Sequence, residues 1–256
     1  MTNGHYLSPA LRSVKSTADW WSERVQAETR LVRWGHYGRP LLLFPTAGGD
    51  AEEVERFFLI KALEAPIVAG HLKVYSVHSL AGRTWLTSDD IAHCVWMQMQ
   101  FDEYLKHEVV PAIRRDCQSD SIGIIAAGAS IGAFSSLLTL SRQPETFTHA
   151  ICMSGTYDLE RWLNGNRIDE FHHYSPLNFI PGLDDDSGQL RQLRKRHVIL
   201  ASGQGKNEDP GQCWRVADVL GSRGIPNRVD IWGVEWEHDW PTWRAMLPRY
   251  IEEILS

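Results

Sequence analysis

The sequence of 256 residues has no long hydrophobic run and no excess of positive charge. No stretch approaches the roughly 20 apolar residues that a membrane-spanning helix needs, so we expect no membrane partner. The formal net charge of −6 gives no electrostatic attraction for nucleic acid. The segment Met1–Ser16 also lacks the apolar core of a signal peptide. Together these absences predict a cytoplasmic protein.

The sequence is also poor in cysteine, and it contains no internal repeat or low-complexity linker. Its four cysteines are widely separated and form no C-x-x-C pair: Cys94, Cys117, Cys152 and Cys213. Disulfide frameworks belong mainly to short secreted chains, so we expect free thiols here. A hydrophobic content of 43% with 23% charged residues excludes wholesale disorder, collagen-like repeats and coiled coil. Tryptophan is abundant, with 11 residues.

Short apolar segments alternate with helical patterns along most of the chain. Antiparallel strands are predicted within 20–34, and buried strands at 40–45, 72–77, 121–127, 149–154, 197–201 and 228–232. Helical spacing covers 52–65, 89–115 with an interruption near Pro111, the segment up to 140, 213–222 and 241–255. This order predicts an α/β fold with a mostly parallel central sheet, helices on both faces and antiparallel strands at the N-terminal edge. We expect one domain over 1–256, with an irregular cap-like insertion around 158–190.

The loops at the carboxyl ends of parallel strands are where such folds place their chemistry. Gly128-Ala-Ser130-Ile-Gly132 follows a buried strand and precedes a helix, and it has the form G-x-S-x-G. A sharp strand-to-helix turn forces the serine into a strained conformation, and flanking glycines relieve contacts with neighbouring elements. The pattern predicts a nucleophilic serine at Ser130.

A serine hydroxyl is a weak nucleophile and needs a base within hydrogen-bonding reach. Among 11 histidines, His238 lies between the last predicted strand and the final helix, so it is the predicted base. We interpret its neighbour Asp239 as a helix cap, because an adjacent residue rarely reaches the imidazole nitrogen. The adjacent His172 and His173 are not expected to converge on a metal ion.

A carboxylate must orient the imidazole and stabilise its charged form. The loop after strand 197–201 is the usual place for this acid in the order serine, acid, histidine. Asp209 is the first candidate there and Glu208 the second, while Asp158 after the preceding strand is a third. The sequence leaves the choice among them open.

The negative charge that develops on the substrate carbonyl needs two backbone N–H donors. One is predicted at Ile131, directly after the nucleophile. The other is expected in the small-residue loop that follows Phe44, at Ala47 or alternatively Gly48, where the backbone can approach a substrate closely.

Four segments together resemble the "putative esterase" (esterase D-like) family of α/β-hydrolases: LLLFPTAGGD (41–50), GASIGAF (128–134), MSGTYDL (153–159) and HDWPTW (238–243). That family includes S-formylglutathione hydrolases, feruloyl esterases and mycolyltransferases. The resemblance implies an α/β-hydrolase fold. It also assigns Ser130 as nucleophile, His238 as base, and Ala47 and Ile131 as oxyanion donors. The chain departs from the pattern at the acid, because many relatives carry Asp a few residues beyond the strand-ending glycine, where Lys206 stands here.

The sequence therefore predicts a serine carboxylesterase that hydrolyses small acyl or aryl esters through an acyl-enzyme. No cofactor or metal is expected, because this chemistry runs on protein groups alone. Two alternatives remain at this stage: an acyltransferase with the same triad, and a non-catalytic binding protein that retains the fold, for which Lys206 is the only hint. The natural substrate, its acyl chain and the oligomeric state are not specified by the sequence.

Overall fold

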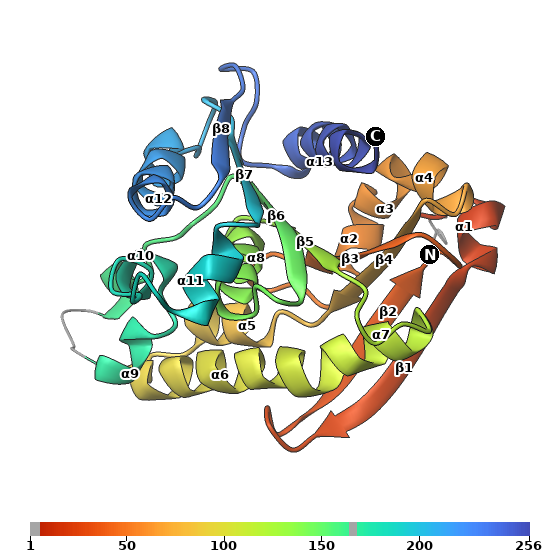
Figure 1. The fold of residues 1–256 in the computed structure, drawn as a ribbon. Coiled ribbons are helices and arrows are strands. Elements are labelled where there is room, and N and C mark those ends of the chain that lie inside the picture. The colour runs from red at the N-terminus through yellow and green to blue at the C-terminus, as the bar shows by residue number, and fades with distance from the viewer. Residues whose placement is uncertain (1–5, 164–167) are drawn as a thin grey trace.

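A computed structural model describes residues 6–163 and 168–256 and contains an eight-stranded sheet (Figure 1). The strand order is β1-β2-β4-β3-β5-β6-β7-β8. The strands are β1 (Lys15–Ser22), β2 (Ala27–Trp34), β3 (Arg39–Phe44), β4 (Leu72–Val77), β5 (Ile124–Ala129), β6 (Phe147–Met153), β7 (His197–Ser202) and β8 (Asn227–Ile231). β1 pairs antiparallel with β2, and β2 pairs antiparallel with β4, whereas all the other pairings are parallel. The predicted sheet, including its antiparallel N-terminal edge, is confirmed.

The helices are distributed over both faces of this sheet. Between residues 6 and 116 they are α1 (Pro9–Ser13), α2 (Glu53–Arg56), α3 (Leu59–Ala62), α4 (Glu64–Val68), α5 (Leu80–Thr87), α6 (Ile91–Tyr104), the π-helical η1 (Leu105–Val109) and α7 (Val110–Asp116). The remainder are α8 (Ile131–Arg142), the 3-10 turn η2 (Glu160–Leu163), α9 (Asp169–His172), α10 (Pro176–Phe179), α11 (Gly188–Leu193), α12 (Pro210–Ser222) and α13 (Trp240–Leu255).

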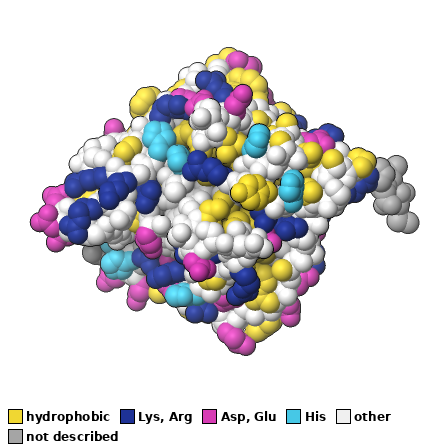
Figure 2. Space-filling model, turned by 45° about the vertical axis from the view of Figure 1, so that its right-hand side comes forward, with side chains coloured by type: hydrophobic (Ala, Val, Ile, Leu, Met, Phe, Trp, Pro, Cys, Tyr) yellow, Lys and Arg dark blue, Asp and Glu magenta, His cyan; other side chains and the backbone are white. Residues whose placement is uncertain are grey.

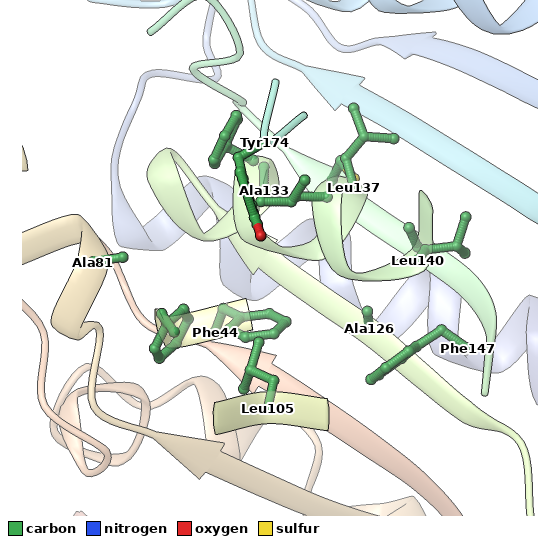
Figure 3. Close-up of a cluster of buried hydrophobic side chains, with 14 of the residues drawn as sticks. Phe44, Ala81, Leu105, Ala126, Ala133, Leu137, Leu140, Phe147 and Tyr174 are labelled. Atoms are coloured by element: carbon green, nitrogen blue, oxygen red, sulfur yellow. The ribbon is translucent and has the colours of Figure 1, made fainter. Parts of the chain in front are cut away.

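Two hydrophobic cores, one on each face of the sheet, explain why the strand segments of the sequence are continuous apolar runs. In β3, Leu42 and Phe44 belong to one core, whereas Leu41 and Leu43 belong to the other. The first core lies under α5, α6, α8 and α12, and Figure 3 shows α8 side chains in it with Phe44. The second lies under α1 to α4 and α13. Because both faces of these strands are buried, the register of the sheet is fixed. The position at which each loop begins is fixed with it.

The helices depart from the sequence-based boundaries more than the strands do. The predicted helix 52–65 is three short helices, because Phe58 between the first two adopts a left-handed conformation with φ 62°. The predicted helix 89–115 is α6, a π-helical turn and α7 in succession. Pro111 lies in the first turn of α7, where a proline needs no hydrogen-bond partner for its missing N–H. The interruption predicted near Pro111 takes the form of the π-helical turn η1 just before α7.

The parallel strands all end at the same edge of the sheet, so the loops after β3, β5, β6, β7 and β8 lie near one another. These loops contain all the predicted catalytic residues. Within residues 6–163 and 168–256, every helix is too short or too polar to span a bilayer.

Candidate active site

Ser130 occupies a strained turn between β5 and α8. Its backbone angles are φ 57° and ψ −121°, in a region that residues with a side chain rarely adopt. The turn is held on the sheet because the Ser130 N–H donates to the Met153 carbonyl at 3.0 Å. The Ser130 carbonyl accepts from Ala133 at 3.1 Å and from Thr156 at 3.3 Å. The backbone geometry is that of a nucleophile elbow, as the sequence predicts.

The two glycines of the motif are required by close backbone contacts. A Cβ on Gly128 would lie 2.4 Å from the carbonyl oxygen of Gly132. A Cβ on Gly132 would lie 2.7 Å from the carbonyl oxygens of both Phe44 and Pro45. The start of α8 therefore touches the backbone at the end of β3, and this contact brings the loop that carries Ala47 toward Ser130.

The predicted oxyanion donors Ala47 and Ile131 lie against the same residue, Gly82 of α5. A Cβ on Gly82 would be 3.2 Å from the Ala47 Cα atom and 3.1 Å from the Ile131 Cγ2 atom. The two residues thus come together from different loops. The nearest side-chain atom to a Cβ on Gly48, the alternative donor, belongs to Leu86 of α5 at 3.8 Å.

A buried carboxylate, Glu53 of α2, holds the loop that carries Ala47. Its two oxygens accept hydrogen bonds from the Thr46 N–H at 2.8 Å and the Thr46 hydroxyl at 2.9 Å. Burial raises the pKa of Glu53, although the bonds from Thr46 oppose that shift. A Cβ on Gly49 would lie 2.3 Å from the Glu53 Oε2 atom, so the loop wraps tightly around the carboxylate.

Glu208, in the loop between β7 and α12, is the carboxylate that faces His238. Its Oε2 atom lies 3.9 Å from His238 Nδ1, and its side chain is only 1% exposed. Two hydroxyls donate to it: Ser154 at 2.5 Å and Ser202 at 2.9 Å. Ser154 in turn accepts from the indole N–H of Trp243 at 3.0 Å. This network fixes the carboxylate next to the imidazole.

The electrostatics of this network keep Glu208 ionised. Burial by itself would raise the pKa of Glu208. The adjacent His238 and the hydroxyls of Ser154 and Ser202 outweigh that effect and hold the pKa below its ordinary value. A negative charge beside the imidazole is what a base of this kind needs in order to become protonated during a reaction.

Asp209, the first candidate for the acid, does not face His238. It is the N-cap of α12, and its carboxylate accepts from the Gly211 N–H at 3.1 Å and from the Gln212 amide at 3.2 Å. The third candidate, Asp158, pairs with Arg215 at 3.2 Å. The order of preference derived from the sequence is therefore corrected, and the second candidate, Glu208, takes the place next to the imidazole.

Local backbone geometry explains why Glu208, two residues after Lys206, faces His238. The Lys206 carbonyl accepts a hydrogen bond from the His238 N–H at 3.0 Å, so this residue supports the base through its backbone. Asn207 then adopts a left-handed conformation with φ 63°, which turns the chain before Glu208. The loop after β7 and the loop after β8 are also tightly packed, since a Cβ on Gly203 would lie 2.0 Å from the Trp236 carbonyl oxygen.

His238 lies at the start of the final helix. Its ring packs edge-on against Trp243, with 5.3 Å between ring centroids, and its side chain is 24% exposed. Asp239 caps α13, as the sequence indicates. Within the described residues, the Ser130 hydroxyl makes no hydrogen bond to His238, so the contact between nucleophile and base stays a prediction. Catalytic hydrogen bonds are often long in unliganded enzymes and shorten when substrate binds.

Sequence reasoning missed three residues that hold the acid: Ser154, Ser202 and Trp243. Ser154 directly follows β6, and Ser202 is the last residue of β7. A position at the carboxyl end of a strand is a signal that also contributed to the prediction of Ser130. Most other tryptophans near the site pack against aromatic neighbours. Trp85 lies against Trp162 and Phe171, and Trp240 stacks on Phe57 with 4.5 Å between centroids.

Three comparisons with known proteins bear on this site. The family model described as "Putative esterase" matches residues 95–253, more than half of the chain. A solved ferulic acid esterase superposes with a TM-score of 0.71 at 14% identity, covering 94% of this chain and 97% of that chain. An S-formylglutathione hydrolase from Agrobacterium tumefaciens superposes with a TM-score of 0.68 at 12% identity, covering 94% of both chains.

A fluorophosphonate-binding serine hydrolase from Staphylococcus aureus superposes with a TM-score of 0.65 at 13% identity, covering 94% of this chain and 98% of that chain. At such identities these likenesses establish the fold, which is that of the α/β-hydrolases. No curated protein sequence matches the chain.

Proposed function

We propose that this chain, which belongs to the "Putative esterase" family and is a carboxylic ester hydrolase, acts through Ser130, His238 and Glu208. The observation that carries the proposal is the pair of features at one edge of the sheet. A serine is held at φ 57° in a strained elbow after β5, and a buried carboxylate in the loop after β7 is held 3.9 Å from an imidazole in the loop after β8.

In the first half of the proposed reaction, His238 takes the proton of the Ser130 hydroxyl while the serine oxygen attacks the ester carbonyl carbon. The carbonyl oxygen gains negative charge and accepts hydrogen bonds from the Ala47 and Ile131 N–H groups. As the C–O bond to the alcohol breaks, the protonated imidazole gives its proton to the departing alkoxide. An acyl group is then esterified to Ser130.

In the second half, His238 takes a proton from a water molecule, and the hydroxide attacks the acyl carbon. The carbonyl oxygen is again stabilised by the same two N–H groups. Collapse of the intermediate releases the carboxylic acid, and the proton returns from the imidazole to the Ser130 oxygen. Glu208 remains ionised throughout and stabilises the imidazolium in both halves.

The substrates we propose are small acyl or aryl esters. The support is family membership and the predicted oxyanion loop, whose Thr46 is anchored by Glu53. Glu208 also removes the reason for considering a non-catalytic member, because a carboxylate is present beside the imidazole although Lys206 stands at the usual position.

An active-site-directed fluorophosphonate tests the nucleophile. We expect the probe to label the wild type, and Ser130→Ala to lose both labelling and hydrolysis of p-nitrophenyl acetate. The matched control is Ser135→Ala, because among the described residues the Ser135 hydroxyl donates only to the Ile131 carbonyl of the same helix, at 3.2 Å. Hydrolysis that persists in Ser130→Ala, with the fold intact, would defeat the assignment.

The same assay separates hydrolysis from transfer to an alcohol. An acyltransferase with this triad would pass the acyl group to an added alcohol in preference to water. We expect the free acid to remain the main product when an alcohol acceptor is added at millimolar concentration. A dominant transesterification product would favour the acyltransferase.

A further inference from the structure

A second group of ionisable side chains lies at the opposite edge of the sheet from Ser130. It surrounds a pocket of about 450 Å³ at the amino ends of β3, β6 and β7. The pocket is lined by Arg39, Thr148, His149, Arg194, Lys195, Arg196, His197 and Pro226. None of these residues is acidic, although acidic residues outnumber basic ones in the whole chain by 32 to 26.

Within the described residues, three of the four cationic side chains of this pocket form no ion pair. Arg39 donates to the Ile254 carbonyl at 3.2 Å. Arg196 donates to the Pro144 carbonyl at 2.5 Å and to the Gln192 amide oxygen at 3.2 Å. Among the described residues, neither of these guanidinium groups nor Lys195 forms an ion pair. Arg194 differs, because it pairs with Asp185 at 3.2 Å.

Two histidines complete the pocket, and their behaviour reports its positive potential. The rings of His149 and His197 lie with their centroids 6.4 Å apart. Burial, together with the charges of Arg39, His197 and Arg196, lowers the pKa of His149 to about 4. Burial and Arg228 lower the pKa of His197, and Glu253 opposes that shift. Both shifts favour the neutral imidazole.

Clusters of Lys and Arg side chains with His beside them are also visible on the molecular face in Figure 2, so positive charge is unevenly spread over this acidic chain. Guanidinium groups recognise phosphate oxygens through paired N–H donors. A neutral imidazole can donate one further N–H or gain a proton next to an anion.

We propose that the pocket bounded by Arg39, His149, Lys195 and Arg196 binds the phosphate group of a small phosphorylated molecule. Three uncompensated cations match the charge of a multivalent oxyanion. The overall negative charge of the chain opposes the large polyanionic surface of a nucleic acid or a membrane, so the ligand is small. This site lies at the other end of the strands from Ser130, and its assignment does not rest on the proposed esterase mechanism.

Calorimetric titration with inorganic pyrophosphate at constant ionic strength tests the proposal. We expect saturable binding with one site per chain. Lys195→Ala and Arg196→Gln should each weaken it about tenfold, the effect of losing one charged hydrogen bond. The matched control is Lys106→Ala, which removes an equally exposed lysine on η1, outside the pocket.

Two further measurements guard against an indirect effect. Arg196→Lys keeps the charge without the planar fork and should bind with intermediate affinity, which separates charge from geometry. In NMR titrations, pyrophosphate should raise the pKa of His149 in the wild type. The proposal is overturned if binding is not saturable, if Lys106→Ala weakens it as much as Lys195→Ala, or if the His149 resonances do not respond.

Discussion

The buried carboxylate of Glu208 is stabilised by the polar groups around it. A carboxylate removed from water is destabilised unless hydrogen-bond donors surround it. Here two hydroxyls supply those donors, the imidazole lies 3.9 Å away, and the Trp243 indole N–H donates to one of the hydroxyls. The imidazole is thereby given a fixed negative neighbour, which favours its protonated form during catalysis.

Neutralising this carboxylate should therefore affect the rate more than the fold. We expect Glu208→Gln to lower kcat by about a hundred- to ten-thousand-fold, because an amide cannot stabilise the imidazolium. The control is Asp209→Asn, the same chemical change one residue away. Asparagine is also a good N-cap, so this variant should keep kcat within about twofold of the wild type. Steady-state kinetics that reverse this order would contradict the role of Glu208.

The choice between these neighbours was open at the level of sequence, because both follow β7. One signal was available: Pro210 follows Asp209, and proline is common at the first position of a helix, directly after its N-cap. That pattern assigns Asp209 to the helix and leaves Glu208 free. The left-handed turn at Asn207 that directs Glu208 toward His238 has no comparable signal, since asparagine adopts many conformations.

Glu53 has a positioning role at the other side of the proposed catalytic centre. Its carboxylate is the acceptor for both Thr46 donors, and Thr46 directly precedes the proposed oxyanion donor Ala47. We expect Glu53→Ala to lower kcat about tenfold or more while KM changes little. A misplaced N–H donor weakens stabilisation of the transition state more than it weakens binding of the substrate.

Rescue by a conservative variant distinguishes positioning from general destabilisation. Glu53→Gln keeps one carbonyl acceptor for Thr46, so it should recover part of the kcat lost in Glu53→Ala. Unfolding curves measured beside the kinetics show whether each variant is folded at the assay temperature. A folded Glu53→Ala enzyme with wild-type kcat would exclude this role.

At the scale of elements, one close backbone contact in the site is between the start of α8 and the end of β3. It exists because Gly132 has no side chain. The strands were predictable from their apolar runs, since burial on both faces leaves few other options for such sequences. The division of 52–65 into three helices was not, because it depends on the left-handed conformation of Phe58, a residue type that seldom adopts one.

Adding one methyl group at this contact tests its importance. Gly132→Ala places a Cβ 2.7 Å from two carbonyl oxygens, so we expect a loss of about 1–3 kcal/mol of unfolding free energy and at least about a tenfold loss of kcat. Gly221→Ala in α12 is the control, because nothing lies within 4 Å of its added Cβ. In a helix that change should stabilise by roughly 0.5–1 kcal/mol. Equal effects at both positions would contradict the account.

At the scale of the whole molecule, the two edges of the sheet differ in chemistry. The carboxyl edge gathers the elbow, the loop that carries Ala47 and the Glu208–His238 pair, whereas the amino edge gathers four cations, three of which form no ion pair within the described residues. Because one sheet includes strands from Lys15 to Ile231, we propose that residues 1–256 form a single domain. The short helices α9, α10 and α11 fall in the region expected as an insertion; residues 164–167 of that expectation lie outside the described residues.

The α/β architecture followed from sequence, because the alternation of apolar strands and helical patterns determines it. The nucleophile and the base were inferred from motif and strand order, and these two roles stay predictions. The position of Glu208 beside His238 and its support from Ser154, Ser202 and Trp243 did not follow from sequence, since these contacts join the loops after β6 and β7 with the last residue of β7 and with helix α13. Long-range side-chain contacts of this kind have no local pattern from which to predict them.

Trapping the acyl-enzyme tests the account most directly. The enzyme is mixed with p-nitrophenyl acetate, quenched in acid within one turnover, digested, and mapped by mass spectrometry. We predict one acetyl group on the peptide that contains Ser130, with fragmentation placing it on that residue, and none in Ser130→Ala. An active enzyme that carries no acetyl group, or carries it on another residue, would contradict the proposed mechanism.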